Sequence, residues 1–119
     1  MTSEVFNNEV TAQMRRSVDI LCKKAVEYAT DDRLHNFKIA AALEQITPVQ
    51  ALAGMMSKHT VSVYDMCMSG KEYPIELWEE KITDHINYLL LLNAMVREDD
   101  QKEDVKSTDI LSAMEDDGR

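Results

Sequence analysis

Residues 47–97 contain two long apolar patterns with helical spacing, separated by a short segment that contains Gly70 and Pro74. The first pattern opens with Thr47-Pro48-Val49-Gln50, which combines a capping-box pair with proline at the first helical position. Glycine is common just after a helix end, and proline is common where the next helix begins. Because the loop between the two helices is short, they are expected to pack as a long antiparallel hairpin over about residues 48–97.

Two further helices are expected before the hairpin. Apolar residues at steps of four and three predict a first helix over about residues 4–29, with the stripe Met14, Val18, Leu21, Ala25 and Tyr28. Residues 30–32, Thr-Asp-Asp, are types that cap helices, so a second helix is expected to follow and to end near Ile46. Its expected apolar stripe is His35, Ile39, Ala42 and Ile46, with Leu34, Phe37 and Ala41 beside it.

The whole pattern predicts an all-α fold, a compact four-helix bundle in residues 1–98. The long hairpin and the two helices before it have more apolar surface than these four helices can cover among themselves. A homo-oligomer is therefore expected to complete the core. Residues 98–119 hold nine acidic residues against three basic ones, in a chain of net charge −9. Residues 99–119 are therefore expected to form an acidic tail, either a short helix or disordered. The same charge disfavours binding to duplex nucleic acid.

The cysteines and the apolar runs indicate a cellular compartment. Cys22 and Cys67 are far apart, without a second ligand at zinc-finger spacing, so free thiols in a reducing cytoplasm are expected. No apolar signal segment opens the chain. The apolar run from Tyr88 ends at Val96, which is short of the roughly 20 residues that a membrane span needs. A cytoplasmic protein that does not enter a membrane is expected.

His59 and His85 each interrupt an apolar stripe of the hairpin. If the hairpin turns near residue 72, both lie 13 residues from the turn and are expected to face each other at one level. A buried imidazole is costly unless it has partners, so the two histidines belong either to a hydrogen-bonded core or to a functional site.

One flank of the hairpin is expected to collect polar side chains, because of the 100° rotation per helical residue. They are Lys58, Ser62 and Asp65 on the third helix and Glu80, Asp84 and Tyr88 on the fourth. Asp65, Glu80 and Asp84 are then candidate ligands of Mg²⁺, which prefers carboxylate oxygens, with Lys58 as a candidate phosphate contact. The alternative for Glu80 and Asp84 is that acids simply favour the positive end of a helix dipole.

Several segments carry a family resemblance. They are residues 32–38 (Asp-Arg-Leu-His-Asn-Phe-Lys), Lys58-His59 with Ser62, Tyr64-Asp65-Met66, Trp78 with Glu80-Lys81-Ile82, and residues 84–90 (Asp-His-Ile-Asn-Tyr-Leu-Leu). Over about residues 28–98 the chain resembles a group of small tailed-phage proteins of poorly defined function. More distantly, the layout is similar to the phage nucleotide-modification-associated domain and to MazG-like all-α nucleotide pyrophosphatases.

The distant resemblance implies a helical bundle that acts as a dimer or tetramer. In MazG-like enzymes, acidic residues on two helices bind Mg²⁺ for cleavage of a nucleoside triphosphate to monophosphate and pyrophosphate. Glu80 and Asp84 would match the late acidic pair, and Asp65 would stand in for an acid of the earlier helix. The doubled motif Glu-Glu-x-x-Glu of that earlier helix is missing; its place is taken by Lys58, His59, Ser62 and Asp65. Either fewer carboxylates with a histidine hold the metal, or only nucleotide binding is kept.

Two classes of function follow from these patterns. The first is a Mg²⁺-dependent nucleotide hydrolase of the pyrophosphohydrolase type, in which His59 or His85 positions water or accepts a proton. Its substrate-binding candidates are Lys58, Ser62, His35, Asn36 and Tyr88. The second is a non-catalytic phage accessory protein in the host cytoplasm. It would bind a host protein or sequester a nucleotide signal, in a counter-defence role.

Overall fold

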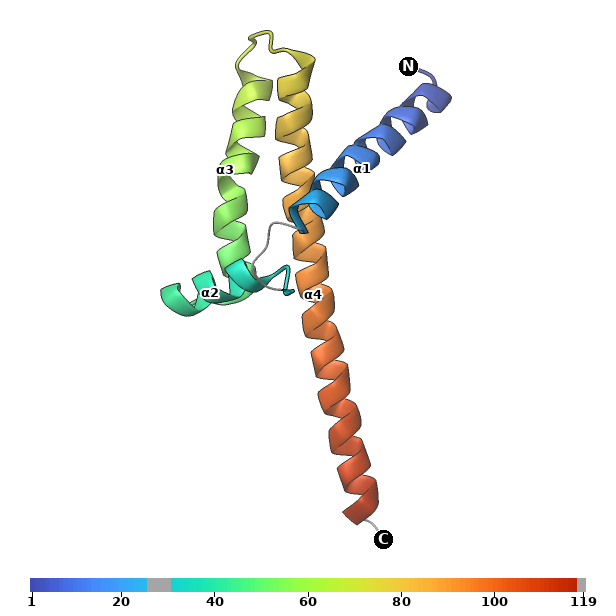
Figure 1. Ribbon diagram of the computed structural model, residues 1–119, viewed down its shortest axis with the longest axis vertical. Helices are drawn as coiled ribbons and strands as arrows, with labels where there is room; N and C mark the ends of the chain where they lie inside the picture. The colour runs from blue at the N-terminus through green and yellow to red at the C-terminus, as the bar shows by residue number, and fades with distance from the viewer. Residues whose placement is uncertain (26–30, 118–119) are drawn as a thin grey trace.

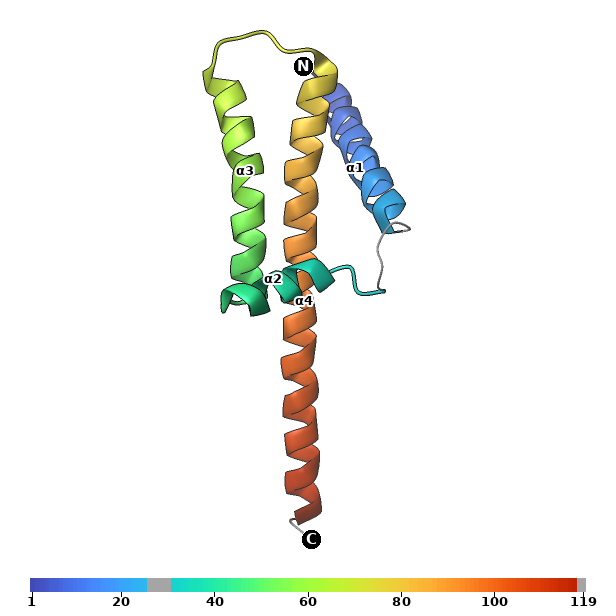
Figure 2. The same cartoon turned by 60° about the vertical axis from the view of Figure 1, so that its left-hand side comes forward.

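The computed structural model describes residues 1–25 and 31–117, and the side chains of residues 1–23 and 31–102. Over these residues the chain forms four helices and no strand: α1 (Ser3–Ala25), α2 (His35–Glu44), α3 (Pro48–Met68) and α4 (Ile75–Asp117). None of the described helices is long and apolar enough to cross a membrane. The predicted all-α fold with its long antiparallel hairpin is confirmed, and α3 lies beside the first half of α4 in both views (Figures 1 and 2).

The hairpin begins where its capping residues predict. The Gln50 backbone N–H donates to Thr47 Oγ1 at 3.2 Å, and the Thr47 backbone N–H donates to Gln50 Oε1 at 2.9 Å. Pro48 occupies the first helical position, where its missing N–H removes no helical hydrogen bond. Gly70 follows the end of α3 with φ of 69°, a left-handed conformation that glycine adopts without a Cβ clash. Both ends of α3 are therefore set by local residues.

The core lies at the end of the hairpin where α2 crosses it (Figure 1). Its buried residues are Leu34, Phe37, Leu52 and Met95. Leu52 is completely buried, and Met55, Tyr88 and Leu91 pack against this cluster. At roughly 25 cal/mol per Å² of buried apolar surface, these contacts are the main force that holds α2 against the hairpin.

The start and the buried face of α2 differ from the prediction. Asp32 Oδ1 accepts a hydrogen bond from the Leu34 backbone N–H at 2.9 Å, so it stabilises a turn, and α2 begins only at His35. The buried residues are Leu34, Phe37 and Ala41, whereas Ile39 of the predicted stripe is 47% exposed. A helix this short offers two possible apolar faces. The face with the large aromatic side chain, Phe37, gains more from burial and faces the core.

In the described part of the chain, α1 packs only against α4. The crossing point is formed by two fully buried small residues, Ser17 and Thr83, at 0% and 1% exposure. Gln13 Nε2 donates to Thr83 Oγ1 at 2.9 Å. The predicted stripe of α1 is wrong at Met14 and Val18, which are 40% and 49% exposed, whereas Leu21 is partly buried and lines a pocket; the side chains of Ala25 and Tyr28 lie outside the described ones. Small side chains let two backbones approach closely. The face of α1 that is buried against α4 is therefore the one with Ser17, and the predicted apolar face with Met14 and Val18 is exposed.

The fold is open rather than compact. The predicted end of the fourth helix near residue 97 is wrong: α4 continues to Asp117 and projects past the other helices (Figures 1 and 2). Residues 97–108 contain no glycine or proline that would end a helix. The radius of gyration is 19.7 Å, against about 13 to 14 Å for a compact domain of this length.

Candidate functional site

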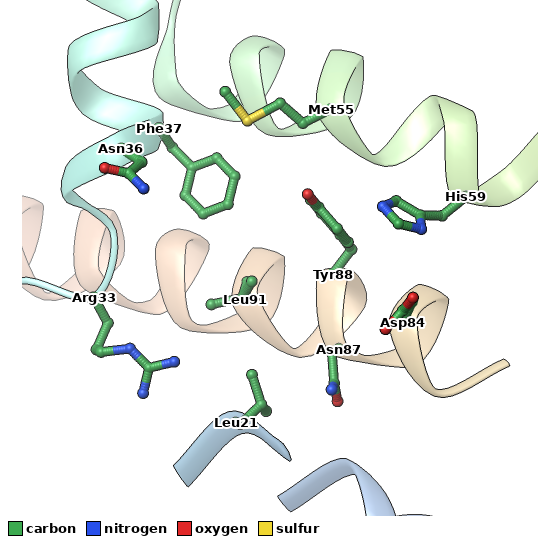
Figure 3. Close-up of a pocket in the computed structure, with 10 residues that line it drawn as sticks. All are labelled: Leu21, Arg33, Asn36, Phe37, Met55, His59, Asp84, Asn87, Tyr88 and Leu91. Carbon is green, nitrogen blue, oxygen red and sulfur yellow. The ribbon is translucent and has the colours of Figure 1, made fainter. Parts of the chain in front are cut away.

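A pocket of about 220 Å³ lies next to the core, and all four helices contribute to it. Its lining residues are Leu21 from α1, Arg33 before α2, Asn36 and Phe37 from α2, Met55 and His59 from α3, and Asp84, Asn87, Tyr88 and Leu91 from α4 (Figure 3). Pockets for drug-sized ligands usually measure about 300–1,000 Å³. This pocket therefore suits a small planar molecule or one part of a larger ligand.

The contribution of α4 follows from its helical spacing. Asp84, Asn87, Tyr88 and Leu91 stand at steps of three, four and seven from the first of them, so they share one face. The structure places Asp84 and Tyr88 together, two residues that the helical geometry assigns to one flank. Asn87 belongs to the same face and is not among the site residues predicted from the sequence. The signal was its spacing of three residues from Asp84.

Asn87 is the most informative polar residue of the pocket. This residue is 6% exposed, and its Oδ1 atom has no hydrogen-bond partner among the described residues. A buried acceptor without a partner costs roughly 1–3 kcal/mol of folding free energy. Such a cost is tolerated where a ligand supplies the missing donor. The amide is therefore a candidate ligand contact of the pocket.

Aromatic rings form one wall of the pocket. The rings of His59 and Tyr88 lie 4.7 Å apart, centroid to centroid, with an interplanar angle of 33°. Phe37 meets Tyr88 edge to face, with a centroid distance of 6.3 Å and an angle of 75°. A wall of this kind provides flat apolar surface on which a planar ring can stack.

His59 is held in its neutral form by its surroundings. Partial burial lowers its pKa, and the positive charges of Lys58, Lys81 and nearby His85 lower the pKa further, while Asp84 opposes the shift. His85 has a different partner: its Nε2 atom lies 2.9 Å from Thr60 Oγ1. Both histidines thus contact the opposite helix of the hairpin, His59 through Tyr88 and His85 through Thr60, and of the two His59 lines the pocket; that they face each other stays a prediction.

The charged residues of the pocket are Arg33 and Asp84. Figure 3 shows them at different ends of it, with Arg33 near Leu21 and Asp84 near His59. A guanidinium group presents a planar fork of donors that matches carboxylate or phosphate oxygens. Arg33 is not among the site residues predicted from the sequence, although it directly precedes Leu34 and His35.

Other predicted site residues lie outside the pocket. Lys58, Asp65 and Glu80 are exposed, and His35 and Ser62 are half-buried without lining it. Glu80 borders a separate hollow with Arg16 and Glu76. Among the described side chains, no group of three or more His, Cys, Asp or Glu residues is placed to hold a metal ion. The Mg²⁺ site of Asp65, Glu80 and Asp84 stays a prediction.

The site therefore combines a stacking wall, a buried amide acceptor and two opposite charges in a small volume. These groups can bind a planar polar molecule that carries an anionic substituent. Comparisons of this chain with protein-family models, with curated proteins and with solved structures find no match, so its function is argued from the site.

Proposed function

We propose that the chain binds a nucleotide, or a small molecule derived from one, with the base in the pocket between α2, α3 and α4. The observation that carries this proposal is the Oδ1 atom of Asn87, a buried acceptor without a partner among the described residues, in a pocket that the rings of His59 and Tyr88 also line. A carboxamide recognises bases well, because it offers a donor and an acceptor side by side to the base edge.

The size of the pocket decides which part of a nucleotide it takes. About 220 Å³ is enough for a base and part of the sugar, but a triphosphate needs more room. The phosphates would leave the pocket, and Arg33 is the cation in its wall that suits them. Lys58, exposed on α3 next to His59, remains a second candidate for phosphates that project outwards.

Hydrolysis is a separate part of the proposal, and the geometry supports it less. One carboxylate, Asp84, lines the pocket with the neutral imidazole of His59. Mg²⁺ prefers six oxygen ligands, so this donor set alone fits the ion poorly. Binding is therefore the function that these residues support best. A Mg²⁺-dependent reaction would need Asp65 and Glu80 to approach Asp84.

The test is a panel of nucleoside mono-, di- and triphosphates, with and without Mg²⁺, in which thermal stability and product formation are followed in the same samples. Stabilisation without product indicates a binder. Stabilisation with Mg²⁺-dependent product that is lost in Asp84→Ala indicates a hydrolase. If no nucleotide stabilises the chain at millimolar concentration, the proposal is wrong.

A matched pair of variants makes the screen specific for the pocket. Asn87→Leu removes the buried amide, and Asn93→Leu makes the same change at an exposed position on the same helix. Stabilisation by nucleotide should be lost in Asn87→Leu and kept in Asn93→Leu. If both variants respond like the unmodified chain, any binding lies elsewhere.

The second predicted function, a non-catalytic accessory protein that binds a host protein, has one observation in its favour. On the outer face of α3, Val61, Tyr64 and Met68 are 56%, 63% and 68% exposed at steps of three and four residues. An apolar strip of this kind suits a helical partner. Substitution of Tyr64 by Glu should then abolish capture of a host protein and leave nucleotide binding unchanged.

A further inference from the structure

A row of exposed apolar side chains runs along α4 at steps of seven residues. Ile75, Ile82, Leu89 and Val96 are 64%, 37%, 47% and 46% exposed. Seven residues make almost two helical turns, so the four side chains lie close to one line along the helix. The line extends through the half of α4 that lies beside α3 in Figure 1.

The other faces of α4 already have partners. His85 forms a hydrogen bond with Thr60 of α3, and Thr83 is buried at the contact with α1. Ile82 stands three residues before His85 and Leu89 four residues after it, so helical spacing alone places both near the face of α4 that meets α3. Ile82 and Leu89 nevertheless stay 37% and 47% exposed, so the described residues of the chain cover the row only in part.

We propose that this row is the contact surface between two copies of the chain, whose α4 helices pack against each other antiparallel in a symmetric dimer. Apolar residues that recur at every seventh position keep one line of a helix in contact with a second helix along its length. In a two-fold dimer the same surface serves both partners, so one row is sufficient for both sides of the contact. The proposal is independent of the nucleotide site.

The surface area supports a second copy. The accessible surface of the chain is 9135 Å², whereas a compact monomer of 13.6 kDa exposes about 6,600 Å². Even if half of this excess belongs to the projecting end of α4, more than about 1,000 Å² per chain is left. That area exceeds the roughly 800 Å² per partner that a standard stable interface buries.

The distribution of charge favours the antiparallel arrangement. The helical positions that border the row are 78, 79, 85, 86, 92, 93, 99 and 100, and the charged residues among them are Glu79, Asp99 and Asp100. Glu79 lies 3.9 Å from Arg16. The middle of the row, Ile82 and Leu89, can therefore be buried with little desolvation of charge, whereas Asp99 and Asp100 border its end at Val96. A parallel pair would bring two acidic segments, residues 98–119, side by side, whereas an antiparallel pair keeps them at opposite ends.

The first test is the mass of the full chain in solution, measured by light scattering or sedimentation. The unmodified chain should have twice the mass of 13.6 kDa at micromolar concentration. Ile82→Glu and Leu89→Glu should reduce the mass to that of the monomer without loss of helical circular dichroism, because both positions are exposed in the single chain. Val61→Glu, at an exposed position of α3, is the matched control and should remain dimeric.

A second measurement tests the direction of packing. A spin label at exposed Gln101, with Cys22 and Cys67 replaced by Ser, reports the distance between the two copies. Antiparallel packing about the middle of the row predicts about 45 Å between the labels, from a rise of 1.5 Å per residue. A distance below about 20 Å would overturn the antiparallel arrangement. A monomeric unmodified chain, or dimers that persist in both Glu variants, would overturn the proposal as a whole.

Discussion

The ring of His59 lies 4.7 Å from the ring of Tyr88 and is tilted by 33° against it, so the two residues connect α3 and α4 through the wall of the pocket. This contact has an electrostatic consequence. Burial beside Tyr88 disfavours the imidazolium form and lowers the pKa of His59 below its ordinary value of 6.5. The pair therefore belongs to the contact between α3 and α4 and to the lining of the pocket, and it makes the stability of the fold depend on pH.

The pKa of His59 predicts a loss of stability in weak acid. The unfolded chain binds a proton at this residue below about pH 6.5, and the folded chain binds it only at lower pH. The free energy of unfolding should therefore be highest above pH 6.5 and should fall as the pH drops below that value. In His59→Gln this part of the pH dependence should disappear. Urea unfolding at pH 7.5 and pH 5.5 measures this change in the free energy of unfolding. If the free energy falls by the same amount in His59→Gln and in the unmodified chain, His59 is not the group responsible.

Asn87→Leu should stabilise the chain in the absence of a ligand. Oδ1 of Asn87 is buried without a partner, and an apolar side chain of similar size removes that cost. A gain of about 1 kcal/mol, or about 4 °C in Tm, is expected in thermal unfolding. A residue that served the fold alone would instead destabilise the chain when replaced, and that result would argue against a binding role.

The crossing of α1 over α4 should tolerate no large side chain at Ser17. This residue is 0% exposed against fully buried Thr83, so Ser17→Leu should force the helices apart and cost about 1–3 kcal/mol. Val18→Leu is the control, because Val18 is 49% exposed. Chemical unfolding and hydrogen exchange of α1 distinguish the two variants. Equal stability of the two would mean that the helices do not cross at Ser17.

The ion pairs of Lys38 should stabilise the fold except in strong acid. Lys38 Nζ lies 2.7 Å from Asp32 Oδ2 and 2.8 Å from Glu98 Oε1, and its hydrogen bonds lower the pKa of both carboxyl groups. Groups with a lowered pKa stabilise the fold above their ordinary values of 3.8 and 4.5, and this contribution is lost as the pH falls through the lower folded values.

Lys38→Met should therefore cost less than about 1 kcal/mol at pH 7, because these side chains are partly exposed, and almost nothing at pH 2. Lys71→Met, at an exposed position of the hairpin loop, is the control and should have little effect at either pH. Thermal unfolding at both pH values measures the difference. A cost that is the same at pH 7 and pH 2 would mean that Lys38 acts through the packing of its aliphatic stem.

Local signals predicted α3 well. The capping box at Thr47, the proline after it and Gly70 act on neighbouring residues, so they need no knowledge of the rest of the chain. The faces of α1 and α2 could not be predicted in the same way. Which face of a helix is buried depends on its partner, and the close approach at Ser17 has no apolar signature in the sequence.

The residues of the pocket were predicted only in part, because helical spacing is a local signal whereas burial depends on the rest of the fold. His59, Asp84 and Tyr88 lie on two helices whose pairing the loop dictates, so helical spacing was enough to bring them to one flank. Arg33 joins the site only through the fold of the segment before α2. The spacing of Asn87 from Asp84 places it on the same helix face, but its burial and its Oδ1 atom without a partner among the described residues follow only from the fold.

The most direct test of the central claim is a nucleotide titration of the isotope-labelled chain, followed by the side-chain amide resonances of Asn87 and Asn93 in NMR spectra. We predict that the Asn87 amide shifts in a saturable way, together with the ring signals of His59, while the exposed Asn93 amide stays in place. If no nucleotide moves the Asn87 signal at millimolar concentration, or if Asn93 shifts and Asn87 does not, the pocket is not the nucleotide site.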